Sequence, residues 1–362
     1  MKTIVHVVGA RPNYMKIAPL MEALKPAPGI RQILVNTGQH YDEAMSKGFL
    51  RELSLPVPDR NLEVGSASQA VQTARVMIGF EDVCLADRPD LVVVVGDVNS
   101  TMAASLVAAK LLIPIAHVEA GLRSFDRTMP EEINRIVTDR LADLLLTPSA
   151  DGNENLTSEG VPPEKIHLVG NIMIDTLLRH LPMATLARIQ DRVPVRDRAY
   201  GVLTLHRPSN VDDPKTLRQI LQAIATIARQ LPVVFPVHPR TRERLNTFGV
   251  DELLANVIVT EPLGYIDFLS LTSHARVVLS DSGGLQEEST ALGIPCLTLR
   301  ENTERPVTVT HGTNCVVGTT TEAILTSFAD AMAREHHPHR PPLWDGHTAG
   351  RIATVLTEFL AS

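Results

Sequence analysis

Short apolar runs, rich in β-branched residues, alternate with helix-like stretches along the chain. One of them, Leu91–Val95, reads LVVVV with no polar position, a pattern typical of a strand buried on both faces of a sheet. The other strands predicted in the first half are Thr3–Val8, Gln32–Asn36, Pro114–Val118, Leu144–Thr147 and Ile166–Val169. Helices are predicted between them over Tyr14–Leu24, Ala67–Ala86, Thr101–Leu112 and Glu131–Ala142. This alternation predicts a doubly wound α/β domain with a parallel sheet.

The second half of the chain shows the same alternation of strand-like and helix-like segments. Its predicted strands are Gly201–Leu205, Val233–Val237, Val257–Val259, Arg276–Leu279 and Cys296–Leu299. Its predicted helices are Pro214–Gln230, Thr241–Phe248, Tyr265–Leu271, Leu285–Leu292 and Thr321–Arg334. We therefore expect two Rossmann-like domains, residues 1–175 and 176–362, with a hinge around residues 170–200. The final helix, Thr348–Leu360, is expected to cross back onto the first domain.

Polar residues follow almost every predicted strand. Ligands of open parallel sheets bind outside the carboxyl ends of the strands. If the two sheets face each other, these residues line one cleft between the domains. A single carboxylate at a strand end is more often a loop residue whose hydrogen bonds are satisfied within the protein. The prediction of a cleft therefore depends on the whole set of residues. The members of that set are Gly9, Ala10, Arg11, Gly96, Asp97, Glu119, His206, Arg207, His238, Ser280, Asp281, Ser282, Gly283, Gly284, Arg300, Glu301, Asn302, Glu304 and Arg305.

Two segments predict anion sites. In SDSGGLQEES, Ser282, Gly283 and Gly284 follow a strand and open a helix, where amide groups bind anions; the plainer alternative is an N-cap with a tight turn. Glu288, a turn further on, would repel phosphate and is expected to accept sugar hydroxyls. In GARPNYMK, Arg11 and Lys16 could face an anion. Neither GxGxxG nor GxxxxGK occurs, so a dinucleotide site and a P-loop are poorly supported.

The segment HVEAGLRSFDRTMPEEINR concentrates acidic residues. Glu119 ends a strand, while Glu131 and Glu132 begin a helix. Carboxylates in a first helical turn are often only dipole partners, and for Glu132 that reading is as good as a catalytic one. With Asp97 and His206, the residues Glu119 and Glu131 are our candidates for acid and base catalysis.

Composition narrows the function classes. The chain has 362 residues, 44% of them hydrophobic, and a net charge of −7, which argues against general nucleic-acid binding. No apolar run is long enough to span a membrane. Three widely separated cysteines indicate no disulfide framework and favour a cytoplasmic protein. His336, His337 and His339 are expected on a surface loop, and no metal site is predicted.

The motifs GARPNYMKIAPL, TGQHYDEAM, VVGDVNST, HVEAGLRSFDRTMPEEINR, GNIMID, TLHRPSNVD, PLGYIDFLSL and SDSGGLQEE follow one another in this order. Together with ALGIPCLTLRENTERP they closely resemble the non-hydrolysing UDP-N-acetylglucosamine 2-epimerases over essentially the whole chain. The resemblance implies a glycosyltransferase-B-type fold, a UDP-sugar substrate in the cleft, a homodimer, and no metal or nicotinamide cofactor.

The resemblance also implies roles by motif. One group of residues falls on catalytic or substrate-binding positions of the family: Arg11, Lys16, Asp97, Glu119, Glu131 and His206. A second group falls on UDP-sugar-binding positions: Ser282, Gly283, Gly284, Glu288 and Arg305. Phe268 falls where an aromatic residue lies near the uracil.

Four departures from better-known members concern regulation and substrate. Pro208 and Ser209 replace an Arg-Glu pair, Asp42 replaces a glutamine, and GSAS at 65–68 lacks a basic residue. Family residues at these places bind an activating second UDP-N-acetylglucosamine, so that activation is in question here. The loop before Glu131 is shorter, as in a branch that acts on modified sugars, including diacetamido uronates. A hydrolysing epimerase, a glycosyltransferase and a nucleotide-sugar sensor remain alternatives, and the pathway stays open.

The chemistry of 2-epimerisation limits the route. C2 of an N-acetylhexosamine has no neighbouring carbonyl, so its proton is not acidic enough for simple abstraction. Oxidation and reduction at a neighbouring carbon would need a nicotinamide site, which is not evident. Elimination remains: UDP leaves C1, a carboxylate removes the C2 proton to give a glycal, and UDP adds back after reprotonation.

Overall fold

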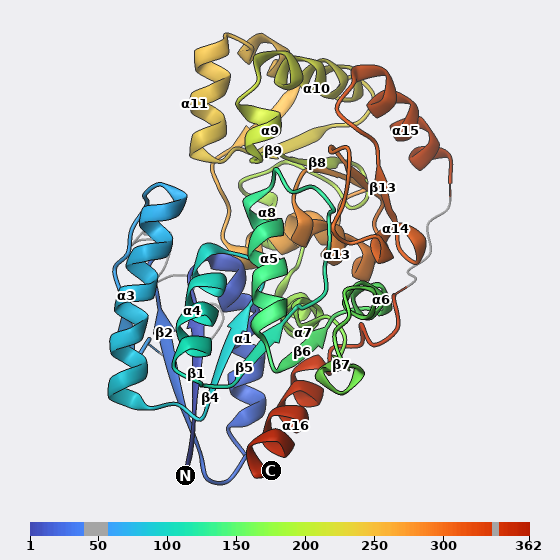
Figure 1. Cartoon of the computed structure of the whole chain (residues 1–362). Coiled ribbons are helices and arrows are strands. Elements are labelled where there is room, and N and C mark those ends of the chain that lie inside the picture. The colour runs from blue at the N-terminus through green and yellow to red at the C-terminus, as the bar shows by residue number, and fades with distance from the viewer. Residues whose placement is uncertain (40–56, 335–339) are drawn as a thin grey trace. The chain divides into compact units, whose positions relative to one another are not determined.

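The computed structural model describes residues 1–39, 57–334 and 340–362. It divides into two compact units, Met1–Thr176 with Pro342–Ser362, and Leu177–Pro341 (Figure 1). Asp42 and the three histidines at 336, 337 and 339 lie outside the described residues. Each unit is a helix-covered parallel sheet.

The first unit is built on a seven-stranded sheet with the order β3-β2-β1-β4-β5-β6-β7. Its strands are β1 (Lys2–Val8), β2 (Ile30–Asn36), β3 (Arg60–Asn61), β4 (Leu91–Val95), β5 (Ile115–Val118), β6 (Leu144–Thr147) and β7 (Ile166–Leu168). Its helices are α1 (Arg11–Leu24), α3 (Gln69–Asp87), α4 (Asn99–Lys110), α5 (Pro130–Leu141), α6 (Ala150–Ser158) and α16 (Thr348–Ala361). Helix α7 (Ile172–His180) runs across the division between the units.

The strand order reverses between β1 and β4, which pair in parallel. From β1 the chain proceeds through α1 to β2, and from β4 it proceeds through α4 to β5 on the other side. Because such crossovers are right-handed, α1 and α4 cover opposite faces of the sheet. Helices α3, α4 and α5 pack side by side, and α1 packs with α16 (Figure 1).

The second unit is built on a six-stranded parallel sheet with the order β10-β9-β8-β11-β12-β13. Its strands are β8 (Gly201–Thr204), β9 (Val233–Pro236), β10 (Val257–Thr260), β11 (Val277–Ser280), β12 (Cys296–Thr298) and β13 (Asn314–Val316). Its helices are α8 (Ala187–Gln190), α9 (Pro208–Val211), α10 (Pro214–Ile227), α11 (Pro239–Phe248), α12 (Tyr265–Ser273), α13 (Gly283–Leu292), α14 (Val307–Thr310) and α15 (Thr321–Ala333). Here the order reverses between β8 and β11.

Alternate residues of the second sheet fill two separate cores. Leu203 of β8 and Leu279 of β11 pack with α10 and α15 on one face. Val202 and Val278, their immediate neighbours, pack with Ile189 and Leu271 on the other. Successive side chains of a strand point to opposite faces, so both faces are apolar and both are covered.

The C-terminal segment completes the first unit. The Asp175 carboxylate accepts hydrogen bonds from the amides of Thr348 and Ala349, 3.1 and 2.7 Å away, and so caps α16. Trp344, which is 2% exposed, donates from Nε1 to the Pro148 carbonyl. Arg351 of α16 donates to the Val169 carbonyl at the end of β7. The unit is therefore assembled from both ends of the chain.

The predicted doubly wound, parallel α/β class is confirmed in both units. Two edge strands, β3 (RN) and β13 (NCV), were not predicted because they are short and carry polar residues. Around the predicted hinge, the structure has helix α7, and the division between the units falls after Thr176. Two cysteines are buried, but Cys315 on β13 is exposed.

Candidate functional site

The sheet reversal in the first unit brings two predicted segments together. Gly9 follows β1, and Gly96 and Asp97 follow β4, the strand paired with it. Glu119 follows β5, which pairs with β4. In doubly wound sheets this edge, where the order reverses, is where ligands bind. The candidate residues of the first unit thus lie at one end of one sheet.

Lys16 and Glu119 form a buried ion pair at this end. Lys16 is 6% exposed and Glu119 is 8% exposed, and the Lys16 ammonium donates to the Glu119 carboxylate. Gly96 (φ +68°) leaves room for the pair, because a Cβ there would lie 3.3 Å from the Lys16 Nζ. Glu119 itself has φ +73°, an uncommon conformation for a residue with a side chain. The strand-end turn therefore aims this carboxylate at Lys16.

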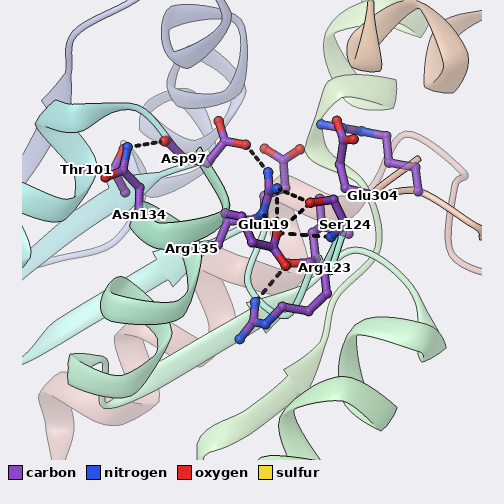
Figure 2. A network of polar contacts seen from close by, with 12 residues as sticks. Asp97, Thr101, Glu119, Arg123, Ser124, Asn134, Arg135 and Glu304 are labelled. Atoms are coloured by element: carbon purple, nitrogen blue, oxygen red, sulfur yellow. Dashed lines mark hydrogen bonds and ion pairs between the residues drawn. The ribbon is translucent and has the colours of Figure 1, made fainter. Parts of the chain in front are cut away.

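Helix α5 buries a polar face, which is unusual for a helix packed on a sheet. Its buried residues are Glu132, Asn134, Arg135, Thr138 and Asp139. Arg135, 2% exposed, pairs with the Asp97 carboxylate and donates to Glu132 Oε2 from Nη2 at 2.7 Å (Figure 2). Asn134 donates to the Asp97 carbonyl at 2.8 Å. Helix α5 thus fixes both the main chain and the side chain of Asp97.

Glu132 holds the loop before α5. Its carboxylate accepts hydrogen bonds from the amides of Ser124 and Phe125, 3.0 and 2.9 Å away. Burial alone would raise the pKa of Glu132, but these amides and Arg135 outweigh it and keep the pKa below its usual range. Glu131 is half-buried beside it, and no hydrogen bond of its carboxylate is recorded within the described ranges. Glu132 therefore has the structural role of holding this loop, and Glu131 remains the candidate for acid or base catalysis.

A second buried network supports the end of β5. His117 Nδ1 lies 2.6 Å from Asp139 Oδ1, and its Nε2 lies 2.9 Å from the Gly96 carbonyl. Arg123 bonds the other Asp139 oxygen at 2.7 Å and also pairs with Glu159. Burial would raise the pKa of Asp139, but the charges of His117 and Arg123 lower it. These contacts fix the main chain on both sides of Glu119.

The second unit places His206 against a buried carboxylate. Asp281, with no exposed surface, accepts from His206 Nδ1 at 2.7 Å and from the His206 and Arg207 amides. Asn210 of α9 donates to the same carboxylate. Burial would raise the pKa of Asp281, yet the His206 hydrogen bond and charge lower it. His206 is exposed, and Asp281 leaves its Nε2 available to a ligand.

The amino end of α13 lies at the second sheet's reversal, next to an arginine cluster. Gly283 makes room for it, since a Cβ there would lie 2.5 Å from Arg305 Nη1. Arg305 donates from Nε to Glu287 at 2.7 Å and pairs with Glu304. Glu304 also pairs with Arg300 at 2.8 Å and Arg207 at 3.5 Å. Burial would raise the pKa of Glu304, but Arg305 and Arg300 lower it strongly. Three arginines against two carboxylates leave net positive charge beside a helix N-terminus.

The remaining candidates are distributed over the second unit. Glu288, 5% exposed, accepts a hydrogen bond from the Tyr265 hydroxyl at 3.2 Å. Phe268 on α12 is half-buried against the core. His238 is exposed and caps α11; burial, followed by the charges of His206 and Arg240, lowers its pKa. Arg11 is the first residue of α1.

Several organising residues were missed from sequence. Arg135, Asp281 and Glu304 are buried, charged and bonded to candidate residues, and buried Asp139 bonds the Gly121 amide, two residues after Glu119. Asp281 and Glu304 stood in the predicted strand-end set but were not given roles. The helical spacing of Glu132, Arg135 and Asp139 was a signal, because three charged residues on one helical face either face water or build a site.

The described part of the chain gives no support for a metal site or for a membrane-spanning helix. In residues 1–39, 57–334 and 340–362, no three His, Cys, Asp or Glu side chains are grouped to hold a metal ion. Within the same ranges, none of the helices has the length and apolar character needed to cross a bilayer. The arrangement instead combines carboxylates at one sheet edge with cations and a helix N-terminus at another.

A family model described as UDP-N-acetylglucosamine 2-epimerase matches residues 22–357. The chain belongs to this family. It is accordingly an isomerase. The UDP-N-acetylglucosamine 2-epimerase of Methanocaldococcus jannaschii is 42% identical over 359 residues, covering 97% of this chain and 98% of that one. A UDP-2,3-diacetamido-2,3-dideoxy-D-glucuronate 2-epimerase of Pseudomonas aeruginosa is 38% identical, covering 98% and 99%.

A solved structure of the M. jannaschii epimerase in complex with UDP-GlcNAc and UDP has a TM-score of 0.91. It is 40% identical and covers 99% of this chain and 100% of that one. The epimerase described here therefore has the GT-B-like fold of that family. Its relatives share the fold but differ in the sugar that their names specify.

Proposed function

We propose that this epimerase interconverts UDP-N-acetylglucosamine and UDP-N-acetylmannosamine without net hydrolysis. The observation that carries the proposal is the full-length similarity to the M. jannaschii enzyme, whose solved structure holds UDP-GlcNAc. The geometry supports it. The point where the strand order reverses carries carboxylates in the first sheet, and cations with helix amides in the second. Phosphate oxygens need cations and amides, and C2 needs carboxylates.

The second unit is proposed to bind the nucleotide. The first-turn amides of α13, at Gly283 and Gly284, and the net positive cluster around Arg305 suit a departing diphosphate. Glu288 suits sugar or ribose hydroxyls better than phosphate because it is a buried anion. His206, oriented by Asp281, can donate from Nε2 to a phosphate oxygen as negative charge develops on UDP.

The first unit is proposed to supply the acid and base. Loss of UDP from C1 gives the sugar oxocarbenium character, which acidifies the C2 proton. A carboxylate removes that proton to form the glycal, and a proton is then delivered to the opposite face before UDP adds back. Asp97, Glu119 and Glu131 are the candidates, with Asp97 held by Arg135 and Glu119 held by Lys16.

A second substrate has specific support. The diacetamido uronate 2-epimerase of P. aeruginosa is nearly as similar, at 38% identity. The same elimination would serve that sugar, whose carboxylate at C6 needs an additional cation. The proposal therefore treats UDP-diacetamido-glucuronate as the alternative substrate of the same site.

The test is deuterium incorporation. With UDP-GlcNAc in D₂O, we expect deuterium at C2 and the UDP-ManNAc epimer, followed by proton and phosphorus NMR. Asp97→Asn and Glu131→Gln should each slow exchange by about 10²-fold or more. Exposed Glu164→Gln serves as the matched control and should not. Stoichiometric release of free UDP and free sugar would identify a hydrolysing enzyme. Exchange only on the uronate would select the alternative, and no exchange on either would reject both.

We also propose that the working form is a homodimer, as the family resemblance implies. This part of the proposal is independent of which sugar is bound.

A further inference from the structure

His117 of β5 is a buried histidine whose two ring nitrogens both lie against oxygen atoms. The side chain has no exposed surface. Its Nδ1 lies 2.6 Å from Oδ1 of Asp139 on α5, and its Nε2 lies 2.9 Å from the carbonyl oxygen of Gly96. A carbonyl oxygen only accepts hydrogen bonds, so Nε2 carries a hydrogen. Whether Nδ1 also carries one depends on the state of Asp139.

Asp139 is held in its charged form by donors on its second oxygen. Its Oδ2 accepts from the Gly121 amide at 3.1 Å and from Arg123 Nη1 at 2.7 Å. Hydrogen bonds donated to a carboxylate and a neighbouring guanidinium both favour the ionised form. An ionised carboxylate only accepts hydrogen bonds, so His117 Nδ1 carries a hydrogen as well. With hydrogen on both ring nitrogens, His117 is an imidazolium.

The charges around Asp139 balance only when His117 is charged. Arg123 is 3% exposed and pairs with Asp139 and with Glu159, both at 2.7 Å. With an imidazolium at position 117, two cations therefore meet two carboxylates. With a neutral ring, one negative charge would be in excess beside Asp139, which is itself 3% exposed. An uncompensated charge is costly in a protein interior, so the balanced arrangement is favoured.

The hydrogen bond from His117 Nε2 holds the main chain next to Asp97. The carbonyl of Gly96 belongs to the peptide that joins Gly96 to Asp97, so His117 fixes the orientation of that peptide. Asn134 of α5 holds the following carbonyl, that of Asp97, at 2.8 Å (Figure 2). The peptides on the two sides of Asp97 are thus fixed by different elements, one by strand β5 and the other by helix α5.

We propose that His117 is a charged positioning residue of this epimerase. Since it has no exposed surface, it acts through the main chain: its Nε2–H directs the Gly96–Asp97 peptide, and Asp139 orients the ring for that contact. The inference rests on the proposed function, in which Asp97 is a candidate acid or base. A catalytic group displaced by about 1 Å can cost about 10²-fold in rate, so loss of the contact should lower turnover more than binding.

The first experiment measures the charge by nitrogen NMR of protein labelled with ¹⁵N-histidine. At the pH of the exchange assay, the His117 ring is expected to give two protonated nitrogen signals whose hydrogens exchange slowly with water. Their loss in the His117 variants assigns them. His6, buried in the same sheet with its pKa lowered to about 4 by burial, is the comparison and should give a neutral ring. One protonated and one bare nitrogen at His117 would overturn the proposal, whether or not the protein is active.

The second experiment separates the two contacts of the ring. In His117→Gln the side-chain amide reaches the place of Nε2 and can donate to the Gly96 carbonyl. In His117→Asn it reaches the place of Nδ1 and can donate to Asp139 instead. His117→Asn should therefore lower kcat for deuterium exchange at C2 by about 10²-fold, with KM changed by less than about threefold. His117→Gln should retain about tenfold more turnover than His117→Asn.

Stability is expected to follow the opposite order. His117→Gln leaves buried Asp139 without its partner, whereas His117→Asn unpairs only a neutral carbonyl, and a lost partner costs more at a charged group. Urea unfolding should therefore rank His117→Asn as the more stable variant. His6→Gln is the matched control: it removes a buried histidine that is bonded to Gln32 and should keep wild-type turnover.

The two orders distinguish positioning from a purely structural role. If turnover follows stability in the His117 variants, or if His117→Gln is as slow as His117→Asn, the proposal fails. If the wild type exchanges no deuterium on either sugar, the proposed function fails instead, and the ring signals still decide the charge of His117.

Discussion

Arg135 joins two carboxylates that belong to different elements. It pairs with Asp97 after β4 and with Glu132 on its own helix, and it is 2% exposed. Lysine cannot replace it fully, because a single ammonium does not bond both carboxylates as a planar guanidinium does. We expect removal of the Arg135 guanidinium to lower both the stability of the protein and its turnover.

We therefore expect Arg135→Gln to lower the free energy of unfolding by about 3–5 kcal/mol, because Glu132 would stay buried without its cation. Arg135→Lys should lie between this variant and wild type in stability and in turnover. Exposed Arg140→Gln on the same helix is the control. Urea unfolding and the epimerisation rate measure the two effects. A fully stable Arg135→Gln would contradict this account of the network.

His6 makes stability depend on pH. It is completely buried on β1, and burial lowers its pKa to about 4, although a hydrogen bond with Gln32 partly offsets this. Above about pH 6.5 the ring is neutral in both folded and unfolded chains, so it adds no pH dependence. Between about 6.5 and 4 only the unfolded chain takes up the proton, and stability falls as pH falls.

The expected loss from His6 across this range is of order 3 kcal/mol. Denaturant unfolding of wild type and His6→Gln at several pH values measures it, since the carboxylates contribute equally to both proteins. Parallel curves for the two proteins would show that His6 does not control this range.

At the scale of residues, the sequence predicts which positions are polar at strand ends but not what they bond. Asp97, Glu119 and His206 follow apolar strands and were found from that pattern. Arg135 and Asp281 escaped because their roles depend on partners 38 and 75 residues away in the chain. The roles of Glu131, Phe268 and the other site candidates stay predictions.

At the scale of elements, the amino end of α13 offers two adjacent glycines with different surroundings. A Cβ at Gly283 would meet Arg305 at 2.5 Å and Glu304 at 2.8 Å, whereas a Cβ at Gly284 would meet nothing within 4 Å. One glycine is thus needed for internal packing. The other has open space at the position that a Cβ would occupy.

We expect Gly283→Ala to destabilise the protein by about 1–3 kcal/mol through overpacking. Gly284→Ala should be neutral or slightly stabilising, because alanine favours a helix. If UDP binds at this helix end, Gly284→Ala should still weaken UDP binding. Calorimetry with UDP, alongside thermal unfolding, separates the two effects. Equal stability losses in the two variants would contradict the packing argument.

The strongly apolar elements were the predictable ones. Strands β4 and β6 have the predicted bounds, and every position in them is buried. Edge strands β3 and β13 carry polar residues and are defined by their pairing with β2 and β12, which no local pattern reveals. Helix α9, PSNV, is a single turn started by Pro208, and it serves to place Asn210 against Asp281.

At the scale of the whole molecule, the two units differ in how the chain builds them. The second unit is one continuous segment, Leu177–Pro341, whereas the first needs Pro342–Ser362 to cover α1. Continuous domains with their own cores fold alone. The segment Leu177–Pro341, expressed by itself, should therefore fold cooperatively.

Deleting Pro342–Ser362 should instead unfold the first unit while leaving the second intact. The deletion removes α16, buried Trp344 and the partners of Asp175. Hydrogen exchange monitored by mass spectrometry would show lost protection in β1 and β4 but not in β8 and β11. Loss of protection in both units would show that they do not fold separately.

The return of α16 to the first unit also sets an order of events on the ribosome. Residues 1–176 emerge before helix α16, which packs on α1. The segment that forms the second unit is complete before that helix is made. The nascent chain therefore exposes the surface of α1 that α16 covers until α16 itself emerges. The first unit is complete only when residues 342–362 have left the exit tunnel.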